Sequence, residues 1–154
     1  MNTLDKQKYI FGSIFLIANK LQVLGDQHLG KGGITTKQWL LTVMISQFHG
    51  KSPTLSEVAE LMGSSRQNVK QLALKLEKKG FLNIQKDDKD ARALRLKLTE
   101  KSRAFWEQRQ KQDEQYVEEL FKDFSIDEID ATFKGFGKLF EKIEQLEKSE
   151  LERV

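Results

Sequence analysis

The chain has 154 residues, a length that suits one compact domain or two small lobes with a substantial core. It has no cysteine, which excludes disulfides, thiolate metal sites and cysteine redox switches. No apolar run is long enough to span a membrane and the first residues do not resemble a signal peptide, so we expect a cytoplasmic protein with no membrane partner.

Charge is unevenly distributed along the chain. Residues 1–53 carry six Lys and Arg against two Asp and Glu, and residues 54–102 carry eleven against seven, so each segment has a net charge of +4. Residues 103–154 carry nine against fourteen, a net charge of −5. This distribution predicts an anionic partner for the middle of the chain and a different role for its end.

The first predicted element is an amphipathic helix over residues 4–29. Its apolar residues recur at spacings of three, four or one, which is typical of one helical face, and Phe11 and Phe15 broaden that face. Glycines in the segment 30–33 end the helix, because glycine adopts the backbone conformations that a helix stop requires.

Four later helix starts carry a hydroxyl residue followed three positions on by Glu or Gln, the pattern of a capping box. The pairs are Thr35 with Gln38, Thr54 with Glu57, Ser64 with Gln67, and Ser125 with Glu128. They open predicted helices over residues 35–48, 54–62, 64–79 and 125–151, and a further, highly charged helix is predicted over 99–121.

The helical period also predicts which side chains face the core. The expected inward residues are Leu40, Val43, Met44 and Phe48 in the second helix, Leu55, Val58, Ala59, Leu61 and Met62 in the third, and Val69, Leu72, Ala73 and Leu76 in the fourth.

Two short strands follow the fourth helix, over residues 81–86 and 94–98. In the second strand Leu94, Leu96 and Leu98 alternate with charged residues, the period-two pattern of a half-buried strand. Two short helices, a tight turn and a charged hairpin are the order of a winged helix-turn-helix, which places one helix against base edges in a DNA groove.

The fourth helix presents a face suited to DNA. Its outward residues are donor-rich and include no carboxylate until Glu77, whereas an ordinary solvated face mixes Glu with Lys. Arg pairs with guanine edges, Asn and Gln pair with adenine, and Ser or Lys pairs with phosphate. The predicted DNA-binding residues of this helix are Ser64, Ser65, Arg66, Gln67, Asn68, Lys70, Gln71 and Lys75.

The hairpin tip is the second predicted DNA contact, through Lys89, Asp90 and Arg92. Arginine suits a narrow, electronegative minor groove. We expect Asp90 to brace the Arg92 guanidinium through a charge-assisted hydrogen bond, so that it points toward DNA. The alternative is a merely polar turn.

The last predicted helix carries a heptad-like apolar stripe. Its residues, with two from the first helix, are expected to form an interface between two chains, and packing against the same chain is the alternative. The predicted dimerisation residues are Ile10, Ile14, Ile129, Phe133, Phe136, Phe140 and Ile143. The expected organisation is a helical dimerisation lobe from residues 1–33 and 103–154, with a winged helix-turn-helix lobe from residues 34–102.

Nothing in the sequence indicates catalysis, a cofactor or a metal. There is no Gly-rich phosphate loop and no histidine–nucleophile spacing, so we expect no enzyme. His28 and His49 lie near predicted helix ends, where a cation is favourable, and no clustered ligand pattern surrounds them.

Five segments carry a family resemblance. They read Ile-Thr-Thr-Lys-Gln-Trp at 34–39, Leu-Ser-Glu-Val-Ala at 55–59, Leu-Glu-Lys-Lys-Gly-Phe-Leu at 76–82, Asp-Ala-Arg-Ala at 90–93 and Leu-Lys-Leu-Thr-Glu-Lys at 96–101. Through these five segments, the chain resembles the MarR family of dimeric bacterial transcription regulators over nearly its whole length. The wing pattern followed by the Leu-x-Leu-Thr strand end is the specific part.

The resemblance implies a mainly helical fold with a small hairpin wing, in which the first and last helices of two chains interlock. It also implies recognition helices in successive major grooves of a pseudo-palindromic operator, with the wings in flanking minor grooves. Many members are repressors released by small aromatic compounds, which bind where the two lobes meet. The residues expected there are Phe15, Trp39, Val43 and Trp106.

Core packing is the alternative role for the two tryptophans. A winged-helix module that binds protein instead of DNA is the alternative to a regulator that acts as a homodimeric repressor. The chain also departs from the family pattern at Ile84 and Lys89, where Arg is common, and at Leu74, a usually polar position on the recognition helix.

Overall fold

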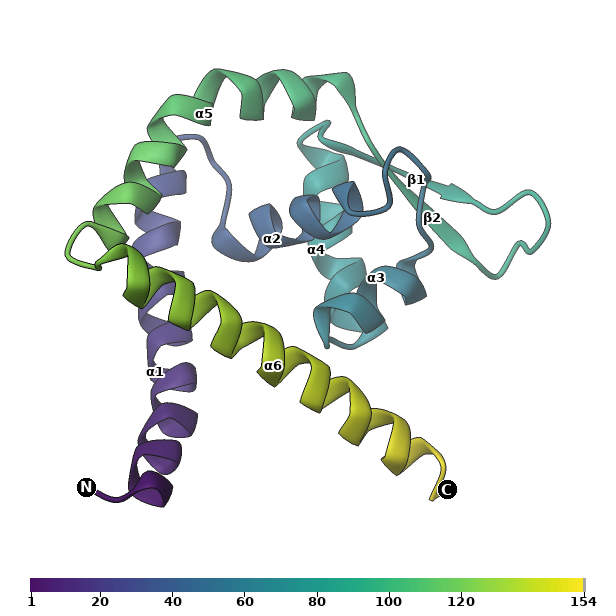
Figure 1. Ribbon diagram of the computed structural model, residues 1–154. Helices are drawn as coiled ribbons and strands as arrows, with labels where there is room; N and C mark the ends of the chain where they lie inside the picture. The colour runs from purple at the N-terminus through teal and green to yellow at the C-terminus, as the bar shows by residue number, and fades with distance from the viewer. Residues whose placement is uncertain (154) are drawn as a thin grey trace. The chain divides into compact units, whose positions relative to one another are not determined.

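A computed structural model describes residues 1–153 of the chain. This part contains six helices and one two-stranded antiparallel sheet (Figure 1). In chain order they are α1 (Thr3–Gly30), α2 (Thr36–Ser46), α3 (Leu55–Met62), α4 (Arg66–Lys78), β1 (Leu82–Lys86), β2 (Leu94–Leu98), α5 (Glu100–Phe121) and α6 (Ile126–Leu151). The order and type of the predicted elements are confirmed, and their ends lie within two residues of the prediction.

The chain divides into two compact units, Met1–Trp106 and Glu107–Val154. Contacts between α1 and α2 place the first helix in the first unit. The backbone N–H of Thr36 donates to the Asp26 carboxylate at 2.7 Å, and the Thr36 hydroxyl donates to the Gln22 carbonyl at 3.2 Å. The dimerisation lobe predicted from residues 1–33 and 103–154 concerns an assembly of two chains and stays a prediction.

Glycine is required where α1 meets Thr36. A Cβ added at Gly25 would lie 2.3 Å from the Thr36 hydroxyl oxygen, a separation that real Cβ atoms do not show. The close approach lets the Thr36 side chain reach the α1 backbone, so this glycine sets the packing of α2 against α1.

Three of the four predicted capping boxes are confirmed, at Thr35, Thr54 and Ser125. The fourth is wrong, because Ser65 caps α4 and accepts from the Asn68 backbone N–H at 3.1 Å. Gly63, with φ of +61°, ends α3, and the Ser64 N–H donates back to the Ala59 carbonyl. Ser64 therefore belongs to the end of α3, and Ser65 is the first residue free to cap the next helix.

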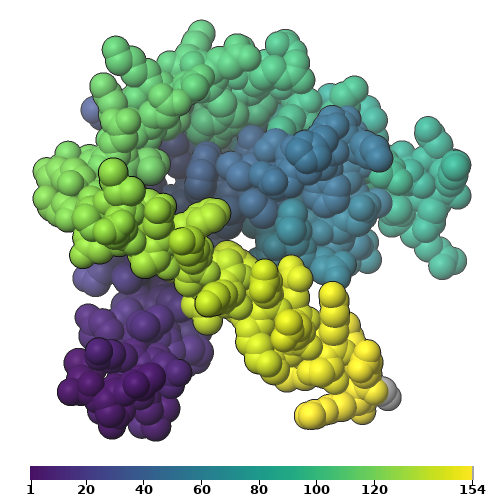
Figure 2. Space-filling model, viewed as in Figure 1, coloured from purple at the N-terminus to yellow at the C-terminus, as the bar shows by residue number. Residues whose placement is uncertain are grey.

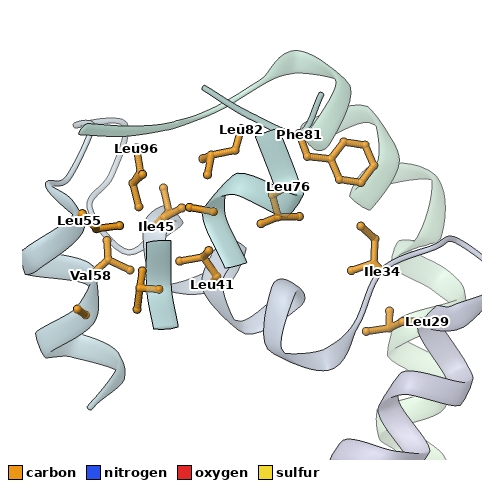
Figure 3. Packing of buried hydrophobic residues seen from close by; sticks show 13 residues of the cluster. Leu29, Ile34, Leu41, Ile45, Leu55, Val58, Leu76, Phe81, Leu82 and Leu96 are labelled. Atoms are coloured by element: carbon orange, nitrogen blue, oxygen red, sulfur yellow. The ribbon is translucent and has the colours of Figure 1, made fainter. Parts of the chain in front are cut away.

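A single core joins α2, α3, α4 and the hairpin (Figure 3). Its fully buried side chains include Leu41, Val58, Val69, Ala73, Leu76, Leu82 and Leu96. The predicted inward faces of α3 and α4 are confirmed for the most part, although Leu61 is half exposed.

The predicted inward face of α2 is confirmed in part: Met44 and Phe48 pack partly buried against the core, but Leu40 is exposed and the prediction omitted Leu41 and Ile45. Leu41 and Ile45 are buried, whereas Leu40 is 37% exposed and Trp39 is 40% exposed. The segment 39–45 is apolar at six of seven positions, so periodicity could not distinguish the face that packs from its neighbour.

The hairpin packs its base against the core and extends its tip away from α3 and α4 (Figures 1 and 2). Leu82 pairs with Leu98 and Ile84 pairs with Leu96, which places the apolar residues of both strands on one face. The Leu96 N–H also donates to the Pro53 carbonyl at 2.9 Å. The segment before α3 thus continues the hydrogen bonding of β2 and anchors the base of the hairpin.

The second unit contains most of α5 and all of α6. The Ser125–Glu128 capping box begins α6, and no residue of this helix is buried. Among residues 1–153, no helix is long and apolar enough to cross a membrane.

Candidate DNA-binding surface

The fourth helix presents the polar face that its sequence predicts. Arg66, Gln67, Asn68, Lys70, Gln71 and Lys75 are all exposed, and Ser65 is exposed at the N-cap. Val69, Ala73 and Leu76 on the opposite face are fully buried, so the orientation of α4 about its axis is set by the core. The structure therefore brings these predicted side chains together on one surface, with Ser64 half-buried beside them.

The nearest carboxylate on α4 is turned toward the hairpin. Glu77 Oε2 accepts the backbone N–H of Ile84, the third residue of β1, at 2.7 Å. This hydrogen bond ties the last turn of α4 to β1. It leaves the face between Arg66 and Lys75 basic, since no Asp or Glu occurs in that part of the helix.

The structure shows where two of the residues that depart from the family pattern lie. Ile84 is half-buried and packs against the core, so an apolar residue there stabilises the base of the hairpin. Leu74 is 42% exposed on α4, and nothing in the structure explains an apolar residue there.

Lys89, Asp90 and Arg92 lie exposed at the hairpin tip, as predicted. The predicted bracing of the Arg92 side chain is wrong in its geometry. Asp90 Oδ1 accepts the backbone N–H of Arg92 at 3.0 Å, and the Ala93 N–H donates to the Asp90 carbonyl at 3.0 Å. A short Asp side chain closes this local turn more readily than it reaches a guanidinium. Asp90 therefore shapes the tip and leaves the Arg92 guanidinium without an ion pair within residues 1–153.

A different aspartate–arginine pair holds the wing. Arg95 Nε donates to Asp87 Oδ1 at 2.5 Å, and Arg95 Nη1 donates to the Ser52 carbonyl at 2.7 Å. Asp87 Oδ2 also accepts the backbone N–H groups of Lys89 and Asp90, at 3.3 and 3.1 Å. Arg95 thus connects the hairpin tip to the segment before α3.

Reasoning from the sequence missed this pair. The sequence did contain a signal for the Asp87–Arg95 pair. An antiparallel hairpin with strands near 82–86 and 94–98 brings Asp87, the residue after β1, close to Arg95 at the start of β2. The contact of Arg95 with the Ser52 carbonyl had no sequence signal, since it joins residues 43 positions apart.

The Asp87 carboxyl should titrate below its ordinary pKa of 3.8, chiefly because the Arg95 guanidinium hydrogen-bonds its charged form. A lowered pKa means that the pair stabilises the hairpin at pH above 3.8 and that this contribution is lost as pH falls through the folded-state pKa. We expect NMR titration of the side-chain carbon to show the low pKa, and Arg95→Gln to return it toward 3.8. An Asp87 carboxyl that titrates identically in both proteins would contradict the pairing.

The four residues predicted for an effector pocket lie in different settings. Phe15 is 59% exposed on α1, and Trp39 is exposed on α2. Val43 and Trp106 are half-buried, and the Trp106 ring packs edge-on against Phe105 with 4.8 Å between centroids. Their grouping around an effector stays a prediction.

Most of the predicted dimerisation residues are exposed in the single chain. On α6, Phe133 is 78% exposed and Phe140 is 66% exposed, and Ile129, Phe136 and Ile143 are also exposed. On α1, Ile10 is exposed and Ile14 is half-buried. The exposed apolar side chains on these helices leave the predicted interface open in one chain, and their role stays a prediction.

Solved structures with similar folds include transcription regulators and DNA complexes. The MarR protein from Peptoclostridium difficile has a TM-score of 0.78 at 18% identity, with 88% of each chain covered. MepR from S. aureus, solved in complex with DNA, has a TM-score of 0.73 at 19% identity, covering 89% of this chain and 97% of that one. At these identities the matches establish the fold.

Sequence identity to characterised relatives establishes the family of this chain. No protein-family model matches the chain. The transcriptional repressor MprA of Escherichia coli is 30% identical over 132 residues, which are 86% of this chain and 72% of MprA. The chain belongs to the MarR family. A second relative, the transcriptional activatory protein BadR of Rhodopseudomonas palustris, is 26% identical over 140 residues, 90% of this chain and 80% of BadR.

MarR membership confirms the resemblance and the fold class predicted from the sequence, a mainly helical winged helix-turn-helix with a small β-hairpin. The residues that set the MarR wing in this chain are Asp87, Asp90 and Arg95, through the contacts described above.

Proposed function

We propose that the chain is a homodimeric, sequence-specific DNA-binding transcription regulator that acts as a repressor in the cytoplasm. The observation that carries the proposal is the exposed, carboxylate-free face of α4 between Arg66 and Lys75, together with the exposed Lys89 and Arg92 at the hairpin tip. MepR and other similar structures solved with DNA support the nucleic-acid partner.

The dimensions of α4 fit the proposed contact. A helix with its side chains is roughly 10–12 Å across and the major groove of B-DNA is roughly 12 Å wide. Arg66, Gln67 and Gln71 supply the donors that distinguish guanine and adenine edges, with Asn68 beside them. Ser64, Ser65, Lys70 and Lys75 supply phosphate contacts that set the register but carry no sequence information.

The wing extends the proposed contact into the minor groove through Lys89 and Arg92. Asp90 contributes by fixing the backbone at the tip, and Arg95 contributes by fixing the base of the wing. The tip carries three aspartates: Asp87 is paired with Arg95, Asp90 accepts a backbone N–H, and Asp88 is exposed.

A second copy of the chain is the proposed partner for α6 and α1. The aromatic stripe on α6 is too large to stay in water on a stable single chain. A two-fold dimer presents two α4 helices and therefore reads a pseudo-palindromic operator whose half-sites lie one helical turn apart.

The proposal also covers whether the chain represses or activates transcription, and which effector it binds. MprA is a repressor and BadR is an activatory protein, and we favour repression because MprA has the higher identity. We propose that a small aromatic effector binds near Phe15, Trp39, Val43 and Trp106, where indole rings can stack on it.

Selection of bound duplexes from random DNA, followed by titration at several salt concentrations, tests the function. We expect an enriched inverted repeat and an affinity that falls steeply as salt rises. The alternative, a winged-helix module that binds protein, predicts no enriched sequence. Absence of enrichment by the purified full chain would contradict the proposal.

Replacing Arg66 with Ala should separate base reading from phosphate contact. We expect a loss of roughly 1–3 kcal/mol on the selected operator and relaxed preference at one base pair of each half-site. Lys75→Ala, the comparison variant on the same helix, should weaken selected and random DNA alike and reduce the salt slope by about one unit per half-site. Equal losses of both variants on both DNAs would show that the two roles are not divided in this way.

A further inference from the structure

An open hollow of about 500 Å³ lies in the first unit, at the C-terminal end of α4. Three segments line it. They are the turn between α1 and α2 at Gly32 and Gly33, the end of α4 at Lys78 and Lys79 with the following Phe81, and the start of α5 at Lys101 and Phe105. Neither the proposed DNA contact nor the proposed effector residues use it.

The hollow is strongly basic. Three of its seven lining residues are lysines, and none of the seven is Asp or Glu. Lysines near a helix C-terminus commonly offset the helix dipole, but that end carries only about half an elementary charge. One ammonium suffices for that purpose, so two positive charges remain without a local anion.

The backbone holds two of the ammonium groups in place. Lys101 Nζ donates to the Lys79 carbonyl at 2.9 Å. Lys79 Nζ donates to the Gly33 carbonyl and, at 3.2 Å, to Gln38 Oε1. An ammonium has three protons, so each keeps at least one donor for a ligand. Lys78 is exposed, and its ammonium group makes no hydrogen bond within residues 1–153.

The aromatic wall of the hollow does not offer a free ring face. Phe81 and Phe105 pack together with 5.0 Å between centroids, and Lys101 Nζ already lies 5.4 Å from the Phe81 centroid. A Cβ on Gly32 would lie 2.8 Å from Phe105 Cζ, so the glycine permits direct contact that closes the wall. The lysine charges, rather than a free ring face, are therefore what the hollow offers to a ligand.

We propose that this hollow binds a small anion bearing one or more phosphate groups, held by Lys78, Lys79 and Lys101. A group with two or more negative charges matches the excess of ammonium groups better than a monocarboxylate does. Lysine acts as a mobile point charge, which suits phosphate oxygens on an open surface.

A DNA backbone phosphate has the same chemistry as a free phosphate compound, and the position of the hollow favours the free compound. Lys78 lies twelve residues beyond Arg66 along α4, which is roughly 18 Å at 1.5 Å per residue. The proposed base contacts lie at the N-terminal end of α4, whereas Lys78 and Lys79 lie at its C-terminal end, beyond the proposed phosphate contact at Lys75, and Lys101 lies on α5.

Isothermal titration of the full chain with pyrophosphate, at fixed ionic strength and with sodium sulfate as the reference anion, tests the site. We expect saturable one-to-one binding per chain that is at least tenfold tighter than sulfate. NMR of the same titration should move the Gly32, Gly33 and Gln38 backbone signals, because the ligand competes with the acceptors of Lys79. Binding no tighter than that of sulfate would overturn the proposal.

Variants locate the site. Lys78→Gln removes an ammonium with no structural contact and should weaken pyrophosphate binding several-fold, and Lys78→Gln with Lys101→Gln should weaken it further. Lys111→Gln, an exposed lysine of α5 outside the hollow, is the matched control and should bind as the unmodified chain does. Equal weakening by Lys111→Gln would overturn the assignment.

Operator titration of Lys78→Gln distinguishes the two sources of phosphate. Unchanged operator affinity with weakened pyrophosphate binding supports the free anion. Weakened operator affinity with unchanged pyrophosphate binding assigns the lysines to the DNA backbone and overturns the proposal. The calorimetric result does not depend on whether the chain binds DNA. Failure of the proposed regulatory function can therefore be distinguished from failure of the proposed anion site.

Discussion

Replacing Phe136 and Phe140 with Asp is expected to abolish the dimer and, with it, tight operator binding. Each substitution places a carboxylate in the middle of the exposed apolar stripe of α6, where the proposed partner chain would have to desolvate it. Linking two half-site contacts raises overall affinity by roughly 10²–10⁴-fold, so loss of the dimer should reduce operator affinity by about that factor.

Sedimentation equilibrium measures the first part of this prediction and operator titration the second. Lys138→Asp, on an exposed position of the same helix between the two phenylalanines, is the matched control and should remain dimeric if only the apolar face packs. Circular dichroism distinguishes a folded monomer from a disrupted chain. An unmodified chain that sediments as a stable monomer at micromolar concentration would contradict the proposed interface.

Replacing Arg92 with Ala is the second large change, with an expected loss of roughly 1–3 kcal/mol in operator binding through the minor groove. Arg95→Gln should cause a smaller loss by a different route. It leaves the Arg92 guanidinium intact but releases the hairpin from Asp87 and from the Ser52 carbonyl. The wing then has more conformations to lose on binding, so affinity falls without loss of a DNA contact.

The double variant decides between these two routes. If Arg95 acts only by positioning Arg92, the double variant should bind no worse than Arg92→Ala, because the two residues act as a unit. Lys97→Gln removes the same charge from the same strand without touching Asp87, and serves as the control. Additive losses would show that Arg95 contacts DNA itself.

Asp90→Asn and Asp90→Ala separate geometry from charge at the tip. An Asn side-chain oxygen can still accept the Arg92 N–H, so the Asn variant should retain operator affinity or gain some through reduced repulsion from phosphate. The Ala variant opens the turn and should bind less tightly. Tighter binding by both variants in the same titration would show that the Asp90 turn contributes nothing.

The sequence by itself determined the order of elements and the polarity of α4. Three capping boxes and the alternation of Leu94, Leu96 and Leu98 are local patterns, and local hydrogen bonding decides where such helices and strands begin and end. The outward face of α4 followed from helical period alone, because the polar and apolar residues of that helix are separated except at Leu74.

Tertiary structure decided what local patterns leave open. The buried face of α2 depends on which of several apolar sides meets the core, and its period does not distinguish them. Asp90 turned out to close a backbone turn, while Arg95 reached a carbonyl 43 residues earlier in the chain. The basic hollow brings Gly33, Lys79 and Lys101 together from three separate segments. Periodicity and capping report only neighbours within a few residues, whereas these contacts depend on how the packed core positions distant segments against one another.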